Sequence, residues 1–239
     1  MRQWKKLKRL WKKPQRLTNI ECLKEPWRKP SGFFYAQSLM KAESWPLAPY
    51  LPPSTNDYCL ELWGKYNFEL KVVAPRKTKL GDYRFKTGQN HHLITINKDL
   101  NPYSFLVVYL HEVAHCINTM KHGTGVKPHG RQWQEEMILL LIPLINEQVF
   151  PQDIKEALES YLKAPKATSC SHPELTRVLR KYDNPSSMVA LESLANGAAF
   201  RFRSKEYRKL ESKRTRVKCM EIKNQRQWLI NKLALVHPL

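Results

Sequence analysis

The spacing of apolar and polar residues predicts a body of helices and short strands in the middle of the chain. Helices are expected over residues 54–67, 101–120, 131–142 and 152–163, and strands over residues 68–74 and 92–97. The longest helix starts with Asn101 as N-cap and Pro102 in the first helical position. Gly81 and Gly88 mark turns or bulges between the strands. The pattern predicts an α+β fold in which a small mixed sheet packs on the long apolar helix.

The C-terminal part of the chain alternates with period two instead. Residues 198–204, 215–222 and 226–231 are predicted strands separated by charged turns, which indicates a small antiparallel sheet. Short helices are expected before it, from about residue 172 to residue 194. The side chains expected to hold this sheet together by packing are Phe200, Phe202, Val217 and Trp228.

These patterns divide the chain into four parts. They are a basic leader with Pro and Trp that packs poorly (1–53), a main domain (54–165), a helical linker (166–195) and a basic β-rich module (196–239). Trp4, Leu7 and Trp11 form one stripe of a short basic helix in the leader, which leaves contact with a membrane surface open as an alternative to contact with nucleic acid.

The net charge of +20 is concentrated near the two ends of the chain. Residues 1–30 hold 11 Lys and Arg against two acids, and residues 201–227 hold 11 against three. A nearly neutral body with two cationic segments favours a polyanionic partner, most simply nucleic acid. A solvated basic surface without a dedicated partner is the alternative.

Cysteine usage and hydropathy indicate the compartment. The five cysteines are scattered and form no C-x-x-C pair, which favours free thiols in a reducing compartment. No apolar run is long enough to span a membrane, and the first residues lack the apolar core of a secretory signal. We expect a cytoplasmic protein, associated with the nucleoid if the chain is bacterial.

The candidate chemistry lies in the middle of the long apolar helix. Residues 105–117 are apolar or aromatic except for His111, Glu112 and His115, and burying these three without partners would be costly. His111 and His115 are one helical turn apart, so both point the same way, as two nitrogen ligands of a tetrahedral metal ion must. H-E-x-x-H on a helix is the pattern of zinc hydrolases. We predict a catalytic Zn²⁺ site with Glu112 as the general base.

A catalytic zinc ion needs a third protein ligand, and the sequence offers several. The metzincin spacing is excluded, because Asn118 and Lys121 occupy the positions of its Gly and His. His129 is favoured, because it follows a flexible loop that can return it over the first helix. The alternatives are Glu135, Glu136 and, near the end of the helix, His122.

Three motifs resemble the SprT-like domain, which bacterial SprT-type proteins share with the eukaryotic DNA–protein-crosslink protease Spartan. They are "RKTKLGDYR" before a strand, "LHEVAH" on the helix, and "HG" followed by Trp133 in the next helix, within a match covering roughly residues 54–150. The resemblance implies His111, His115 and His129 as zinc ligands and Glu112 as the catalytic base. It also implies a protein or peptide substrate.

The C-terminal module resembles the zinc ribbon of that family without its metal site. Cys219 and the distant Cys170 are too few for a ribbon, so no second, structural zinc is expected. Its basic face is expected to bind nucleic acid by phosphate contacts and base stacking, and the resemblance implies that this nucleic acid is DNA. The residues expected to do so are Arg201, Arg203, Lys205, Arg214, Arg216 and Lys218.

The sequence thus predicts a zinc metalloprotease that acts on DNA-bound or crosslinked proteins. The alternative is a DNA- or transcription-associated zinc-binding protein without proteolytic activity. Candidates for stabilising an oxyanion, by proximity in sequence only, are Tyr83, Arg84 and Lys127.

Overall fold

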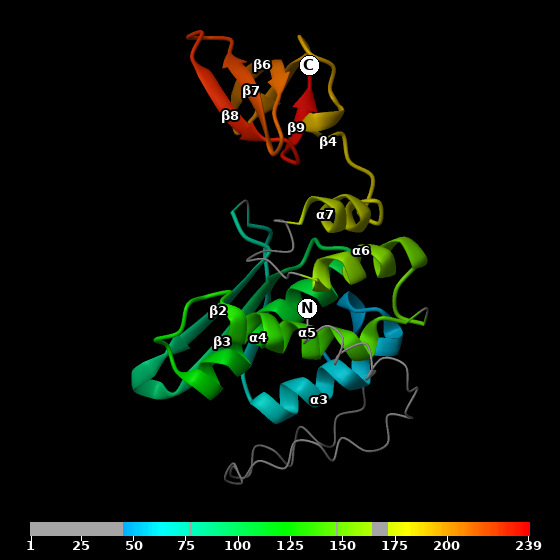
Figure 1. Cartoon of the computed structure of the whole chain (residues 1–239), viewed down its shortest axis with the longest axis vertical. Coiled ribbons are helices and arrows are strands. Elements are labelled where there is room, and N and C mark those ends of the chain that lie inside the picture. The colour runs from blue at the N-terminus through cyan, green and yellow to red at the C-terminus, as the bar shows by residue number, and fades with distance from the viewer. Residues whose placement is uncertain (1–44, 77, 147, 164–171) are drawn as a thin grey trace. The chain divides into compact units, whose positions relative to one another are not determined.

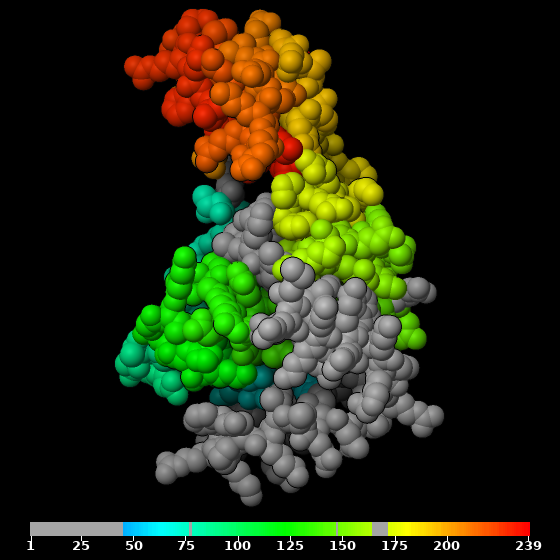
Figure 2. Space-filling view, viewed as in Figure 1, coloured from blue at the N-terminus to red at the C-terminus, as the bar shows by residue number. Residues whose placement is uncertain are grey.

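The computed structural model describes residues 45–76, 78–146, 148–163 and 172–239, and it divides into two compact units, Met1–Tyr182 and Asp183–Leu239. Figures 1 and 2 draw the second unit in gold to red. Each unit has its own sheet and its own hydrophobic core. Among the described helices, none is long and apolar enough to cross a membrane.

The first unit contains a mixed sheet of three strands, β1 (Glu69–Val73), β2 (Gly81–Lys86) and β3 (His91–Asn97). The strand order is β1-β3-β2, with β1 parallel and β2 antiparallel to β3. Gly88 lies in the short turn between β2 and β3, as expected, whereas Gly81 is the first residue of β2 itself. The two sheets and the helices confirm the predicted α+β class.

Helix α4 (Pro102–His122) packs against both β2 and β3. The Asn101 side chain caps its first turn by accepting a hydrogen bond from the Ser104 backbone N–H, as the sequence predicts. Every residue from Phe105 to Ala114 is buried. The long apolar run therefore forms a core helix, and the polar residues within it are buried with it.

Within the described part of the first unit, other helices pack around this core (Figure 1). They are α3 (Asn56–Tyr66), α5 (Arg131–Leu141), α6 (Gln152–Leu162) and α7 (Pro173–Arg180). Short 3₁₀ turns occupy Ala48–Tyr50, Pro53–Thr55, Thr87–Gln89 and Ile142–Leu144. The last of these contains Pro143, the residue expected to end α5.

Two of the predicted domain boundaries differ from the structure. Trp45, Leu47 and Leu51 are buried in the core of the first unit, so at least residues 45–53 do not behave as a poorly packed leader. Residues 1–44 and the linker residues 164–171 lie outside the described residues. The predicted helical linker is also divided, because α7 packs in the first unit whereas Leu191 belongs to the core of the second.

The second unit is an antiparallel sheet of six strands in the order β4-β9-β5-β6-β7-β8. The strands are β4 (Val189–Ala190), β5 (Ala199–Phe202), β6 (Lys205–Ser212), β7 (Arg216–Glu221), β8 (Gln227–Asn231) and β9 (Leu235–Pro238), with a 3₁₀ turn at Leu191–Ser193. Three of these strands match the predicted ones. β4, β6 and β9 were not predicted, and β6 was missed because its charged residues indicated a turn.

One of the four side chains expected to pack in the core of the second unit lies outside it. Phe200 and Val217 are fully buried, and Phe202 packs against them in part. Trp228 is 46% exposed, because it lies on the terminal strand of the sheet, where its Nε1 donates to Glu221 Oε2 at 3.1 Å. The prediction that Trp228 belongs to the core is therefore wrong.

A buried lysine supports this small sheet. Lys209 is only 3% exposed, and its Nζ donates to the backbone carbonyls of Glu192 at 3.1 Å and Leu194 at 2.6 Å. The ammonium group thereby fixes the loop before β5 to strand β6. Cys219 is a buried free thiol, and Cys170 lies outside the described residues.

Candidate metal centre

Two of the three candidate ligands lie one turn apart on α4. His111 and His115 project from the same side of the helix, because four residues complete slightly more than one turn. The Nε2 atoms of the two rings are 3.2 Å apart. The helix therefore supplies a preformed pair of nitrogen ligands.

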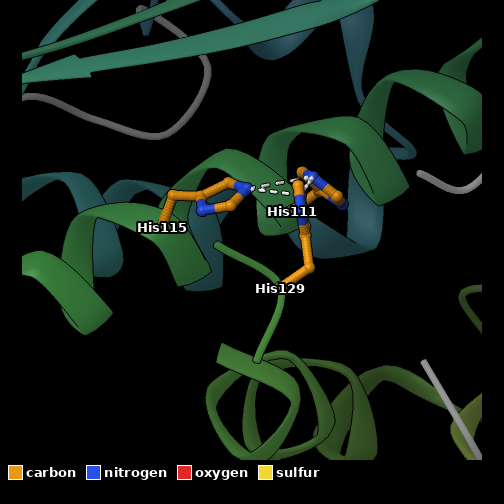
Figure 3. A group of neighbouring side chains, drawn as sticks. All are labelled: His111, His115 and His129. Atoms are coloured by element: carbon orange, nitrogen blue, oxygen red, sulfur yellow. Dashed lines mark hydrogen bonds between the residues drawn. The ribbon is translucent and has the colours of Figure 1, made fainter. Parts of the chain in front are cut away.

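The third candidate, His129, comes from the loop between α4 and α5. Its backbone is left-handed, with φ 59°, and its side chain points back toward α4 (Figure 3). The Nε2 atom of His129 lies 2.8 Å from that of His115 and 3.2 Å from that of His111. The structure thus brings together the three histidines that the sequence favours.

The three nitrogen atoms fit a single divalent ion. Two nitrogen ligands that each lie about 2.0–2.1 Å from a tetrahedral zinc ion are about 3.3 Å from one another. The 2.8–3.2 Å separations found here are close to that spacing. Within the described part of the chain, His111, His115 and His129 form the one group of His, Cys, Asp and Glu side chains that could hold a metal ion.

Burial keeps these imidazoles in the neutral form that binds metals. It lowers the pKa of His111 to about 2, with a further contribution from the adjacent His115 and His129. Burial and the neighbouring His129 lower the pKa of His115 to about 4, and burial also lowers the pKa of His129. Three uncharged donors are therefore directed at one point, without the need to lose protons first.

The alternative third ligands lie elsewhere. Glu136 is buried and its Oε1 accepts from Lys121 Nζ at 2.9 Å, whereas Glu135 pairs with Arg131 at 3.0 Å. His122 is exposed at the C-terminal end of α4. These side chains are not part of the histidine group.

Trp133 packs against all three histidines. Its ring centroid lies 4.7 Å from that of His111, 5.4 Å from that of His115 and 4.8 Å from that of His129. The indole is fully buried, and its Nε1 donates to the His111 backbone carbonyl at 3.4 Å. Trp133 was part of the motif in the sequence, but nothing in the sequence indicated this contact.

Glu112 is buried beside the start of β2. Burial, followed by the nearby Asp82, raises the pKa of its carboxyl group to about 8. The opposing influences are the charges of Arg76 and Lys79 and a hydrogen bond from the Tyr83 backbone N–H. The acid is therefore held against the strand and does not point into solvent.

A second aromatic layer lies next to His115. The Tyr83 ring stacks on the His115 imidazole with centroids 6.2 Å apart and planes at 8°. The Tyr83 hydroxyl is 2.7 Å from His92 Nδ1. Sequence reasoning missed His92, since its approach to Tyr83 depends on the pairing of β2 with β3.

The three candidate oxyanion stabilisers have different surroundings in the structure. The Tyr83 hydroxyl is engaged with His92. Arg84 is exposed, and its Nε donates to Asp82 Oδ2 at 2.7 Å. Lys127 is an exposed residue of the loop that leads to His129.

The cationic residues of the second unit do not all share one face of its sheet. Arg201, Arg216 and Lys218 lie on the face opposite the buried Phe200 and Val217, because side chains alternate along a strand. Arg201 forms an ion pair with Glu206, in which Arg201 Nη2 lies 3.2 Å from Glu206 Oε1. The positions of these three residues agree with the predicted alternation of side chains between the two faces of the sheet.

Lys205, Arg203 and Arg214 lie apart from that face. Lys205 is on the other side of the sheet, where its Nζ is 2.9 Å from a Glu221 carboxylate oxygen. Arg203 is in the turn between β5 and β6, where it and Ser204 have positive φ angles of 48° and 68°. Arg214 is an exposed residue between β6 and β7. The expectation that Arg203 and Lys205 extend the same stripe as Arg201 is wrong, because a two-residue turn follows Phe202.

Comparisons of the chain with protein-family models, curated proteins and solved structures found no match.

Proposed function

We propose that this protein is a zinc-dependent peptide hydrolase. The observation that carries the proposal is the convergence of the His111, His115 and His129 Nε2 atoms within 2.8–3.2 Å of one another. Glu112 is buried on α4, the helix that carries the first two of these histidines. Three imidazole ligands with an open fourth position are typical of catalytic zinc rather than structural zinc. The resemblance of the motifs to the SprT-like domain supports the same chemistry.

Zinc bound to the three histidines would polarise a carbonyl group and bring the pKa of a water molecule toward 7. A cation at the three histidines would favour the ionised form of Glu112. In that form Glu112 accepts the proton that the attacking water loses, and it can then deliver this proton to the leaving amine nitrogen. Trp133 excludes water from the inner side of the three imidazoles.

Strand β2 is suited to hold an extended peptide beside Glu112. It is a terminal strand of the three-stranded sheet among the described residues. The Asn97 N–H donates to the Leu80 carbonyl, and bonded and non-bonded pairs alternate along an antiparallel ladder. The backbone groups of Gly81, Tyr83 and Phe85 therefore face away from β3. The Tyr83 N–H donates to Glu112, and the remaining groups are those with which a substrate strand can pair.

The proposed setting is near nucleic acid, with DNA-bound or crosslinked proteins as substrates. Arg216 and Lys218 support this part of the proposal, because both lie on one face of the second unit near the exposed Leu229. Basic side chains on the face of a small sheet are suited to phosphate contacts.

The test measures metal content and hydrolysis on the full chain. We expect one zinc per chain in the wild type and in Glu112→Gln, and loss of zinc in His129→Ala. Hydrolysis of a labelled unfolded protein should be lost in Glu112→Gln although zinc is retained. A wild type with zinc but no hydrolysis, with or without DNA, would favour the alternative, a DNA-associated zinc-binding protein without proteolytic activity.

A further inference from the structure

The carboxylate of Glu112 lies against the backbone of β2 at a glycine. A Cβ atom at position 81 would lie 2.5 Å from Glu112 Oε1, 2.9 Å from Glu112 Cγ and 2.6 Å from Val108 Cγ1. These separations are shorter than folded proteins tolerate for a Cβ atom, so a side chain at position 81 would displace its neighbours.

Glu112 is the neighbour with the more flexible side chain. Val108 is 4% exposed, and its β-branched side chain has a strongly preferred rotamer within a helix. Glu112 has three rotatable side-chain bonds, and rotation about the first or the second can carry its carboxylate away from position 81. That movement would remove the hydrogen bond that the carboxylate accepts from the Tyr83 N–H.

We propose that Gly81 is a positioning residue for the proton acceptor of the site. Its missing side chain leaves the space in which the Glu112 carboxylate lies against β2 and accepts the Tyr83 amide hydrogen bond. The three atoms nearest to a Cβ at this position belong to Glu112 and Val108 alone, so the change is directed at the acid rather than at the metal ligands. The inference rests on the proposed function for its catalytic meaning.

The first experiment separates the effect of Gly81→Ala on Glu112 from its effect on Val108. In a Val108→Ala background, which removes the clash with Cγ1, Gly81→Ala should lower kcat at least tenfold, with zinc content and KM unchanged. Gly88→Ala is the matched control, because no atom lies within 4 Å of its Cβ position, and it should keep wild-type turnover. If Gly81→Ala/Val108→Ala is as active as Val108→Ala, Gly81 serves only helix packing and the inference is wrong.

The second experiment needs neither zinc nor activity. It measures how Gly81→Ala changes the unfolding equilibrium of the metal-free chain, once with Glu112 present and once in a Glu112→Ala background. The wild type, the two single variants and the double variant form a double-mutant cycle. We expect Gly81→Ala to raise the unfolding constant about tenfold when Glu112 is present and much less when it is absent. Equal effects in both backgrounds would overturn the inference.

The two experiments also distinguish this inference from the proposed function. A wild type that binds zinc and hydrolyses nothing would refute the peptidase proposal, while the double-mutant cycle would still measure the contact between Gly81 and Glu112. An active wild type with an equally active Gly81→Ala/Val108→Ala variant would refute the inference alone.

Discussion

Replacing Trp133 with Leu should weaken zinc binding more than the loss of core packing explains. The indole contacts all three imidazoles at centroid distances of 4.7–5.4 Å, so its removal frees each ring to leave the converged arrangement. Ordering one side chain costs about 0.5–1.5 kcal/mol. Three freed imidazoles should therefore weaken binding by about 1.5 kcal/mol or more, which corresponds to a rise of about tenfold in Kd.

The assay is a competition titration of the full chain with a chromophoric zinc chelator, together with urea unfolding of the metal-free protein. Trp45→Leu is the matched control, because Trp45 is equally buried but packs against Trp63 and Tyr109 rather than against an imidazole. It should lower the stability and leave the Kd for zinc unchanged. If Trp133→Leu shows this same behaviour, Trp133 only fills the core and the reasoning is refuted.

Three further predictions concern other parts of the molecule. Asn101→Ala should lower the free energy of unfolding of the first unit by about 1 kcal/mol, because α4 loses its N-cap; chemical denaturation measures this, and an unchanged midpoint would contradict it. Lys209→Met should destabilise the second unit by about 1–3 kcal/mol, because two loop carbonyls lose their donor. Thermal unfolding followed by NMR of that unit is the readout, and retention of the wild-type melting temperature would show that water replaces the ammonium. Replacing Arg216 and Lys218 together with Ala should reduce the slope of log K against log salt for single-stranded DNA by about 1–2, and an unchanged slope would place the phosphate contacts elsewhere.

The long helix and its ligand pair could be predicted from the sequence because their signals are local. Asn101 and Pro102 mark the start of α4, and the spacing of His111 and His115 places both on one side of it. His129 was one of several candidates, because the path of the loop that carries it is not encoded in any periodic pattern. Its left-handed backbone is uncommon in residues other than glycine, and no local signal in the sequence indicates it at this position.

Other features depend on contacts between segments far apart in the sequence. Gly81 was expected in a turn or bulge, whereas the structure places it in β2, directly against Glu112, which lies 31 residues later in the sequence. Strand β6 was missed because one of its inward positions is Lys209, a charged residue that is buried through hydrogen bonds to a loop. Alternation of apolar residues, the signal for a strand, is absent where a buried position is polar.

The left-handed backbone of His129 has a consequence for the exchange of the ion. His111 and His115 stand on a rigid helix, whereas a left-handed conformation costs a residue with a Cβ atom about 1 kcal/mol or more. We therefore expect His129 to be the first ligand to leave during demetallation, since its release relaxes the backbone while the other two rings stay in place. Ion exchange would then proceed through an intermediate held by two histidines, at a rate set by opening of residues 123–130 and not by fraying of α4.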